Sequence, residues 1–364
     1  MLIDLIAGAR PNFVKIAPII HALMAHEAAG GCLRYRLVHT GQHYDNRMSH
    51  DFFIQLDIPA PDINLEAGSG TQAQQTGTIM QRYEALVSEA PCDLCLVVGD
   101  VTSTMACGIV ARKAGIPVAH VEAGIRSYDW DMPEEINRVV TDAITSWFFT
   151  TTPEAGANLK AAGVEDSRIF FVGNTMIDTL LKNTHRLASP DDPAVANLVA
   201  GDFIVVTLHR PSNVDDPAHL ATLLKAIIDN SGSVPLVFPM HPRTRRTFER
   251  LNDLPDRLII IDPQPYLQFN WLVKNARAVI TDSGGGTEET TIMGIPCLTL
   301  RTTTERPETV TLGTNELLGT DGSAIAEALK RLFGGDWKTG QTPEKWDGRT
   351  AERIVAHLNT LLCP

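Results

Sequence analysis

Short apolar runs alternate with helix-patterned stretches along nearly the whole chain, and this alternation limits the possible folds more than any other feature. The runs are continuously apolar, as in strands that are buried on both faces. Chains that alternate such strands with helices form parallel sheets covered by helices on both sides. The expected strands are Leu2–Ala7, Tyr35–His39, Leu94–Val98, Val118–Val121, Phe148–Thr151, Ile169–Val172, Phe203–Leu208, Leu236–Phe238, Leu258–Ile261, Ala278–Thr281 and Cys297–Leu300.

The length and the spacing of these strands predict two domains. A chain of 364 residues exceeds what one hydrophobic core usually serves. We place an N-terminal Rossmann-like domain at residues 1–174 and a C-terminal one at residues 175–348, with a helix at about 349–364 packing back on the first. The predicted fold class is therefore α/β, with two doubly wound domains whose parallel sheets face a central cleft. Ligands of such sheets bind beyond the carboxyl ends of the strands.

Composition excludes several classes of partner. The formal net charge of −12 argues against binding to nucleic acid or to an anionic membrane. No apolar run reaches the length of a membrane span, and the opening residues do not resemble a signal peptide. The six cysteines lie in apolar segments, so we expect reduced thiols and a cytoplasmic protein. Cys92 and Cys95 form a single CxxC on a strand, which we interpret as core and not as a metal site.

A glycine-rich turn near the C-terminal third predicts a phosphate site. The segment Ala278–Glu289, AVITDSGGGTEE, passes from a buried strand through three glycines into helix-like sequence. Glycines allow a ligand to approach the backbone, and the following helix directs unpaired N–H groups at the turn. We therefore expect a diphosphate at this turn, and one of the two carboxylates that open the helix, Glu288 or Glu289, can reach ribose hydroxyls. An ordinary capped strand–turn–helix joint is the alternative.

Acidic residues follow strands of the first domain. Asp100 and Glu122 come directly after neighbouring expected strands, and Glu134 stands at a helix start that also carries Arg138. Taken one at a time, these residues have structural alternatives, namely helix capping or an i,i+4 ion pair of Glu134 with Arg138. Three carboxylates in one cleft are better suited to general acid and base catalysis. Arg10 and Lys15 stand where the first turn and helix would meet an anion, or where a surface cation follows a tight turn.

Histidine and arginine end two strands of the second domain. His209-Arg210 follows one strand and His241, with Arg243, follows another, a pattern that favours an edge facing phosphate. Phe269 precedes the glycine turn and is either a base-stacking residue or part of the core. Arg306 adds charge beside the turn.

Cofactor motifs are absent from the sequence. It contains neither GxGxxG nor a P-loop, so we expect no bound NAD. Its cysteines and histidines never show the spacing of a zinc site, so we expect no metal.

Ten segments in order along the chain resemble the non-hydrolysing UDP-N-acetylglucosamine 2-epimerases, which have the glycosyltransferase-B architecture. Each segment alone is weak, but ten in family order over nearly the whole chain are highly specific. They are GARPNFVKIAPI (Gly8–Ile19), HTGQH (His39–His43), VVGDVTST (Val97–Thr104), HVEAGIRS (His120–Ser127), MPEEINR (Met132–Arg138), FVGN (Phe171–Asn174), LHRPSN (Leu208–Asn213), MHPRT (Met240–Thr244), TDSGGGTEE (Thr281–Glu289) and RTTTERPE (Arg301–Glu308).

The resemblance implies roles for individual residues. Asp100, Glu122 and Glu134 would face the sugar, with His209 near the leaving group. UDP would lie against the second domain, with Arg10 reaching its phosphates from the first. The implied UDP and substrate contacts are Arg10, Lys15, Arg138, Asn174, Arg210, His241, Arg243, Phe269, Ser283, Gly284, Gly285, Glu289 and Arg306.

The implied reaction inverts C2 of UDP-N-acetylglucosamine to give UDP-N-acetylmannosamine. UDP leaves C1 while a base removes the C2 proton, giving 2-acetamidoglucal, and UDP then adds back; the reaction needs neither NAD nor metal. The alternatives are a 2-epimerase of a UDP-2,3-diacetamido uronic acid, a hydrolysing epimerase, a glycosyltransferase of the same architecture, or a nucleotide-sugar sensor. Relatives are homodimers.

Two departures from the family pattern stand out. Asn12 replaces a carboxylate that many relatives carry beside the phosphate site. Relatives activated by a second UDP-N-acetylglucosamine carry Arg-Gln where this chain has Ser69-Gly70, although Gln42 and His43 of the regulatory pocket are present.

Overall fold

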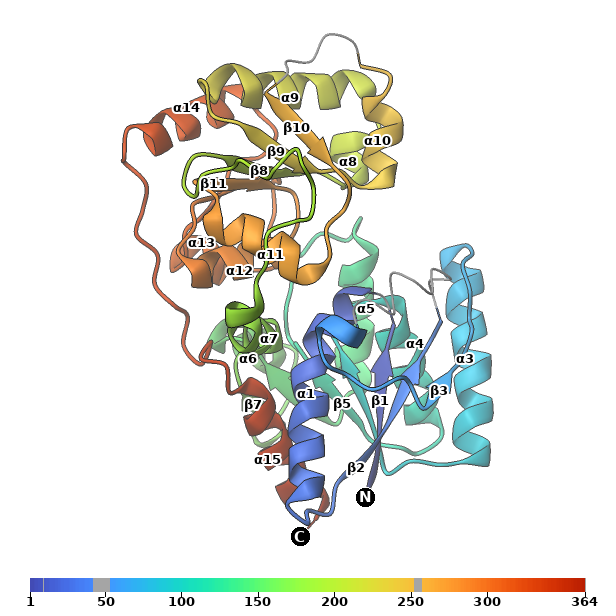
Figure 1. The fold of residues 1–364 in the computed structure, drawn as a ribbon. Coiled ribbons are helices and arrows are strands. Elements are labelled where there is room, and N and C mark those ends of the chain that lie inside the picture. The colour runs from blue at the N-terminus through green and yellow to red at the C-terminus, as the bar shows by residue number, and fades with distance from the viewer. Residues whose placement is uncertain (9, 42–52, 252–256, 364) are drawn as a thin grey trace. The chain divides into compact units, whose positions relative to one another are not determined.

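A computed structural model of the chain describes residues 1–8, 10–41, 53–251 and 257–363, except for the side chains of residues 10 and 11. The chain forms two compact units (Figure 1). Unit 1 contains Met1–Lys182 and Glu344–Pro364, and unit 2 contains Asn183–Pro343. Among the described helices, none is long and apolar enough to cross a membrane.

Unit 1 is built on a seven-stranded sheet with the strand order β3-β2-β1-β4-β5-β6-β7, in which every recorded strand pair is parallel. The order reverses between β1 and β4, so the loops after these two strands diverge to opposite sides of the sheet. The strands are β1 (Leu2–Ala7), β2 (Arg34–His39), β3 (Ile63–Asn64), β4 (Leu94–Val98), β5 (Val118–Val121), β6 (Trp147–Thr150) and β7 (Ile169–Phe171).

Helices of unit 1 cover the sheet. Side chains of α3 and α4, such as Ile79 and Val110, pack with Ile6, Val38 and Val97 of the strands in one core. α1 contacts β1, β2 and β4 and packs beside α15. The helices are α1 (Arg10–Ala28), α3 (Gln72–Glu89), α4 (Thr102–Lys113), α5 (Pro133–Ile144), α6 (Pro153–Ala161), α7 (Thr175–Asn183) and α15 (Thr350–Leu362), with a 3-10 turn at Asp166–Arg168; a second 3-10 turn, Thr184–Arg186, lies at the start of unit 2.

Unit 2 contains a second parallel sheet, of six strands in the order β10-β9-β8-β11-β12-β13. Here the order reverses between β8 and β11. The strands are β8 (Ile204–Thr207), β9 (Leu236–Pro239), β10 (Leu258–Ile261), β11 (Ala278–Thr281), β12 (Cys297–Thr299) and β13 (Asn315–Leu317). The helices are α8 (Pro211–Val214), α9 (Pro217–Asn230), α10 (Pro242–Phe248), α11 (Tyr266–Asn275), α12 (Gly285–Met293), α13 (Pro307–Thr311) and α14 (Gly322–Phe333).

Both faces of the second sheet are buried, which explains why its strands are continuously apolar. Ile204 and Val206 pack in one core that includes side chains of α9 and α14. Val205, between them, packs on the other face with Leu272 and Val273 of α11. The prediction of two parallel α/β domains is confirmed.

The unit boundary differs from the predicted one because α7 belongs to unit 1. Thr179 of α7 donates through its hydroxyl to the Val14 carbonyl at 2.6 Å. Asp178 accepts the Ala351 amide at 2.7 Å, which joins α7 to the start of α15. The chain therefore leaves unit 1 after α7 and returns to it before α15.

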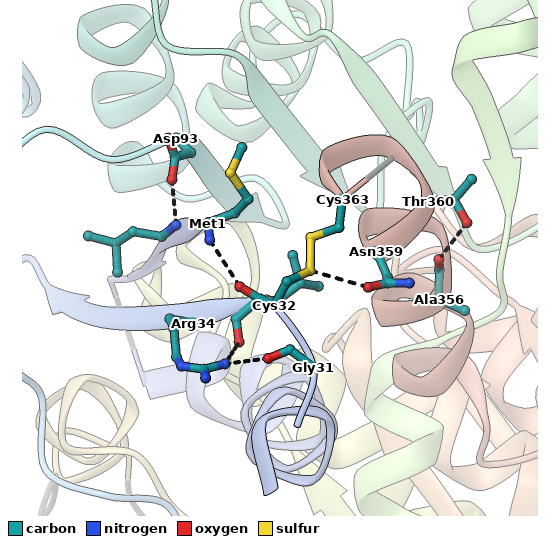
Figure 2. Close-up of a disulfide and its surroundings, with 11 residues drawn as sticks. Met1, Gly31, Cys32, Arg34, Asp93, Ala356, Asn359, Thr360 and Cys363 are labelled. Carbon is teal, nitrogen blue, oxygen red and sulfur yellow. Dashed lines mark hydrogen bonds between the residues drawn. A yellow bond between two sulfur atoms is a disulfide. The ribbon is translucent and has the colours of Figure 1, made fainter. Parts of the chain in front are cut away.

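A disulfide joins Cys32 to Cys363, and this corrects the prediction that all cysteines are reduced thiols. Figure 2 shows Cys32 in the segment before β2 linked to Cys363 just after α15. The two residues are 331 positions apart, so neither spacing nor local pattern pointed to the pair. The other four cysteines are free and buried; Cys92 and Cys95 lie in the core, as predicted.

Candidate active site

The tip of β4 carries Asp100, which α5 holds in place. Arg138 donates to Asp100 Oδ2 from Nε at 3.0 Å and from Nη2 at 2.5 Å. The Asn137 amide donates to the Asp100 carbonyl at 2.8 Å. The Asp100 side chain is 26% exposed, whereas that of Arg138 is 4% exposed. A buried guanidinium thus fixes the direction of a carboxylate that a ligand can still reach.

Glu122, at the tip of β5, is buried and lies in an unusual backbone conformation. Its φ is +70°, in the left-handed region that non-glycine residues seldom occupy. Lys15 of α1 donates to Glu122 Oε2 at 2.7 Å. A Cβ built on Gly99 would lie 3.1 Å from Lys15 Nζ and 3.7 Å from Glu122 Oε2. The Lys15–Glu122 pair therefore lies close to the β4 tip, where Asp100 follows Gly99, and strained backbone of this kind is frequent at functional sites.

Two adjacent glutamates at the start of α5 have different environments. Glu134 is exposed in the first turn, after Pro133. Glu135 is buried and accepts hydrogen bonds from the Ser127 amide at 2.9 Å and from Arg138 Nη1 at 2.7 Å. Burial alone would raise the pKa of Glu135, but these donors outweigh it and the pKa is lowered. Glu135 therefore has a structural role, and Glu134 is the carboxylate open to a ligand.

Several predicted residues of the first domain have other contacts or lie outside the described structure. Asn12 is buried and bridges β1 to β4, since it accepts the Gly8 amide at 3.1 Å and donates to the Val98 carbonyl at 2.9 Å. Asn174 is fully buried and accepts the Met176 amide at 2.9 Å at the start of α7. Lys15 contacts Glu122, as described above. The side chain of Arg10 and the residues Gln42 and His43 lie outside the described residues.

The switch point of the second sheet is organised by Asp282, which the sequence reasoning did not single out. Asp282 follows β11 and is fully buried. It accepts the amides of His209 at 3.0 Å and Arg210 at 2.9 Å, together with Asn213 Nδ2 at 3.1 Å. Its Oδ1 lies 2.8 Å from His209 Nδ1. The pKa of Asp282 is lowered, because these partners outweigh the opposing effect of burial.

His209 is held at one ring nitrogen and open at the other. Its Nδ1 faces Asp282, while 48% of the side chain is exposed. A carboxylate at Nδ1 holds a proton there, so Nε2 is left for a ligand. A carboxylate directly after a strand, opposite a strand that ends in histidine, is the sequence signal from which this contact could have been predicted.

The glycine turn lies beside His209 because β8 and β11 pair directly. Ser283, Gly284 and Gly285 are partly exposed, and α12 begins at Gly285. A Cβ on Gly284 would lie 2.3 Å from Glu305 Oε1, so a larger residue here would displace the Glu305 side chain. The N–H groups at the start of an α-helix attract anions, so the start of α12 is a candidate anion site.

Two buried ion pairs lie beside the glycine turn. Arg306 Nε lies 2.8 Å from Glu288 Oε1, and both side chains are almost fully buried. Arg301 Nη2 lies 2.7 Å from Glu305 Oε2. Arg306 was predicted as a substrate contact; its recorded partner is Glu288 in the first turn of α12.

Glu289 is buried on α12 against two side chains of α11. Asn270 Nδ2 donates to Glu289 Oε1 at 3.2 Å. Burial raises the pKa of Glu289 to about 7, with Asn270 and Tyr266 partly offsetting it. A carboxyl group of this kind changes its charge near neutral pH, in the segment predicted to contact ribose.

A cavity of about 190 Å³ brings together three further predicted residues. His209, His241 and Phe269 line it, together with Thr207, Leu208, Pro239, Pro263 and Gln264. His241 also caps α10, since its Nδ1 accepts the Arg243 amide at 3.2 Å. Arg243 itself is bound by Asp215, with Nη2 at 2.6 Å from Oδ2. An aromatic side chain with two histidines suits a planar, polar ligand group.

Metal ligands do not cluster in the part of the chain that the structure describes. No group of three or more His, Cys, Asp or Glu side chains there could hold an ion. The requirement for a metal or NAD stays untested, and their absence remains a prediction.

Two parallel α/β units with polar side chains at the strand tips define a protein of the glycosyltransferase-B type. Similarity to known proteins narrows this class. The chain belongs to the UDP-N-acetylglucosamine 2-epimerase family, whose sequence model matches residues 27–359.

Individual relatives cover nearly the whole chain. The UDP-N-acetylglucosamine 2-epimerase of Methanocaldococcus jannaschii is 38% identical over an alignment of 372 positions, which covers 98% of this chain and 99% of that protein. The UDP-2,3-diacetamido-2,3-dideoxy-D-glucuronate 2-epimerase of Pseudomonas aeruginosa is 39% identical over an alignment of 367 positions, which covers 99% of this chain and 100% of that protein. The M. jannaschii crystal structure in complex with UDP-GlcNAc and UDP has a TM-score of 0.88 at 38% identity and covers 99% of this chain and 100% of that one.

Proposed function

We propose that this protein interconverts UDP-N-acetylglucosamine and UDP-N-acetylmannosamine by inverting the configuration at C2. The observation that carries the proposal is that each unit has a different set of polar groups at its strand ends. Unit 2 carries the His209–Asp282 pair beside a glycine turn, and unit 1 carries Asp100 and Glu122, each paired with a cation. The relative of M. jannaschii, which has a structure with UDP-GlcNAc and UDP, supports the choice of substrate.

The reaction proceeds by elimination and re-addition. The bond between C1 and the UDP oxygen breaks while a base removes the C2 proton, and a C1–C2 double bond forms. UDP then adds back to C1 while a proton is delivered to the other face of C2. The residues supply a proton acceptor and donor, together with stabilisation of the charge that develops on the departing diphosphate.

We assign the diphosphate to the turn Ser283–Gly285 and to the open Nε2 of His209, which lie on paired strands. The uracil is assigned to the cavity beside Phe269 and His241, and the ribose to Glu289. Asp100, Glu122 and Glu134 are assigned to proton transfer at C2. Glu134 is the most exposed of the three, which suits the group that exchanges protons with solvent.

Incubation with UDP-N-acetylglucosamine in D₂O tests the proposal. We expect UDP-N-acetylmannosamine with deuterium at C2, observed by NMR. Free N-acetylmannosamine with UDP would indicate a hydrolysing enzyme instead. The absence of exchange would contradict the proposal and leave a transferase, a sensor or an epimerase for another sugar such as the diacetamido uronic acid.

Single substitutions test the carboxylates. Asp100→Asn, Glu122→Gln and Glu134→Gln should each lower exchange at C2 by about 100-fold or more while UDP affinity is kept. Glu154→Gln is the matched control for Glu134→Gln, because Glu154 is also exposed and also follows a proline at a helix start. A loss of UDP affinity in place of exchange would make the carboxylates structural.

Three related predictions need separate measurements. We propose a homodimer, testable by light scattering of the purified protein. We propose that activity survives treatment with a chelator and that the purified protein carries no nicotinamide absorbance. We also propose a cytoplasmic location, testable by cell fractionation.

A further inference from the structure

A buried carboxylate on α5 connects the segments that carry all three catalytic candidates. Asp142 is 6% exposed. Its Oδ1 lies 2.8 Å from His120 Nδ1. Its Oδ2 accepts the Gly124 amide at 3.1 Å and lies 2.7 Å from Arg126 Nη1. Burial alone would raise the pKa of Asp142, but His120 and Arg126 outweigh it and the pKa is lowered.

His120 has an acceptor at each ring nitrogen. It lies on β5 and is fully buried. Nε2 is 2.9 Å from the Gly99 carbonyl oxygen, which can only accept, so Nε2 carries a hydrogen. Nδ1 faces the Asp142 carboxylate, which also only accepts when ionised. Both nitrogens therefore donate, and this is the hydrogen-bonding pattern of an imidazolium.

These contacts reach each carboxylate-bearing segment at a defined place. Gly99, which accepts from His120, precedes Asp100. Gly124, which donates to Asp142, follows Glu122 by two positions. Asp142 itself shares α5 with Glu134. One His–Asp pair thus ties together two strand tips and one helix.

The backbone at the tip of β5 must be fixed by its surroundings. Gly99, Glu122 and Gly124 all have positive φ, at +71°, +70° and +79°. This conformation is free of strain for the two glycines, but Glu122 keeps it only where the surrounding contacts hold it. A Cβ on Gly124 would lie 2.2 Å from the Ala155 carbonyl oxygen, so the neighbouring backbone is packed tightly as well.

We propose that His120 and Asp142 form a positioning pair, with His120 as an imidazolium, that sets the spacing of Asp100, Glu122 and Glu134 for proton transfer. Both side chains are buried, so the pair acts through the backbone segments that carry the carboxylates and not by contact with the sugar. This inference rests on the proposed function. The charged or polar groups around the His120–Asp142 pair are Arg126, which also contacts Asp142, and the Gly99 carbonyl, which faces Nε2 of His120.

The protonation of His120 is measured first, in the ligand-free enzyme and without any assay of turnover. In ¹⁵N-histidine-labelled protein at neutral pH, we expect two protonated ring nitrogens for His120, assigned by the loss of its signals in His120→Gln. A single protonated nitrogen would overturn the imidazolium assignment. In Asp142→Asn, the amide can donate to Nδ1, and we expect only Nε2 to keep its hydrogen.

The positioning role is measured by the split between kcat and KM. Misplacing reacting groups by about 1 Å costs about 100-fold in rate, so Asp142→Asn should lower kcat by about that factor with KM changed less than about threefold. Asp178→Asn is the control, because Asp178 is a buried aspartate of the same unit that also accepts a backbone amide, from Ala351. It should leave kcat within about threefold, and the thermal unfolding of both variants is measured alongside, so that a loss of kcat is distinguished from a loss of folded protein.

Equal losses of kcat in both variants would overturn the positioning role and make Asp142 merely structural. An unchanged kcat in Asp142→Asn would overturn it as well. If wild-type protein fails to epimerise UDP-N-acetylglucosamine, the proposed function fails and the positioning role with it, and the NMR result still shows whether His120 is an imidazolium. The two failures are therefore distinguishable.

Discussion

Replacing Glu289 with glutamine tests the claim that this carboxyl group is held in a buried site that disfavours its charge. Burial raises its pKa from 4.5 to about 7 in the folded protein. Each pKa unit corresponds to about 1.4 kcal/mol, so a fully ionised Glu289 costs the folded state on the order of 3 kcal/mol relative to a protonated one. Glutamine carries no charge, keeps an oxygen that can accept from Asn270, and has a similar volume.

The sign of the pH dependence follows from the raised pKa. The folded protein binds the Glu289 proton more tightly than the unfolded chain does, so its stabilising contribution is complete below pH 4.5 and is lost as the pH rises towards about 7. Between about pH 5 and about pH 8, the wild-type protein should lose on the order of 2 kcal/mol of unfolding free energy relative to Glu289→Gln. Any cost of the substitution that does not depend on pH cancels in this comparison.

Urea unfolding of both proteins at the two pH values provides the measurement. We expect the unfolding free energy of the variant to increase relative to that of the wild type as the pH rises, with most of the increase complete by about pH 8. Glu249→Gln, at an exposed position after α10, is the control and should show no such gain. A difference between wild type and Glu289→Gln that is the same at both pH values would refute the reasoning.

Two further predictions concern the disulfide and the glycine turn. Reducing the Cys32–Cys363 bond, or introducing Cys363→Ser, should lower the free energy of unfolding by about 5 kcal/mol, because the bond closes a loop of 331 positions. Urea unfolding with and without reductant checks this, and the serine variant should not respond to reductant. Gly284→Ala should weaken UDP binding by about tenfold in calorimetry, because its Cβ would lie 2.3 Å from Glu305 Oε1 and would displace Glu305 from its ion pair with Arg301 beside the turn. Gly286→Ala, whose Cβ would have its nearest neighbour at 3.8 Å, should bind UDP with a much smaller loss; equal losses would contradict the steric argument.

The sequence predicted the two parallel sheets because buried strands are continuously apolar and punctuated by turns. It missed the edge strands β3 and β13, at Ile63–Asn64 and Asn315–Leu317, because such short polar segments have no apolar run. It placed Asp100, Glu122 and His209 at strand tips, since residues after parallel strands gather at one edge of a sheet. These placements need only local pattern and topology.

The partners of these residues could not be predicted, because they depend on packing between segments far apart in sequence. Lys15 was predicted to meet a ligand anion or to be a surface cation, and the structure shows a partner that neither interpretation named, Glu122, 107 positions away. Asn12 was expected beside a phosphate and bridges β1 and β4. Arg138 binds Asp100 and the buried Glu135, contacts that no periodicity distinguishes from an i,i+4 pair with Glu134.

The disulfide also changes what a single break in the backbone can do. Cys32 and Cys363 close a covalent ring that contains both passages of the chain between the units and the whole of unit 2. A protease that nicks one bond anywhere inside this ring opens it without releasing a fragment. The nicked protein should migrate as one species on a non-reducing gel, because the disulfide still joins α15 to the rest of unit 1. After reduction it should migrate as two species.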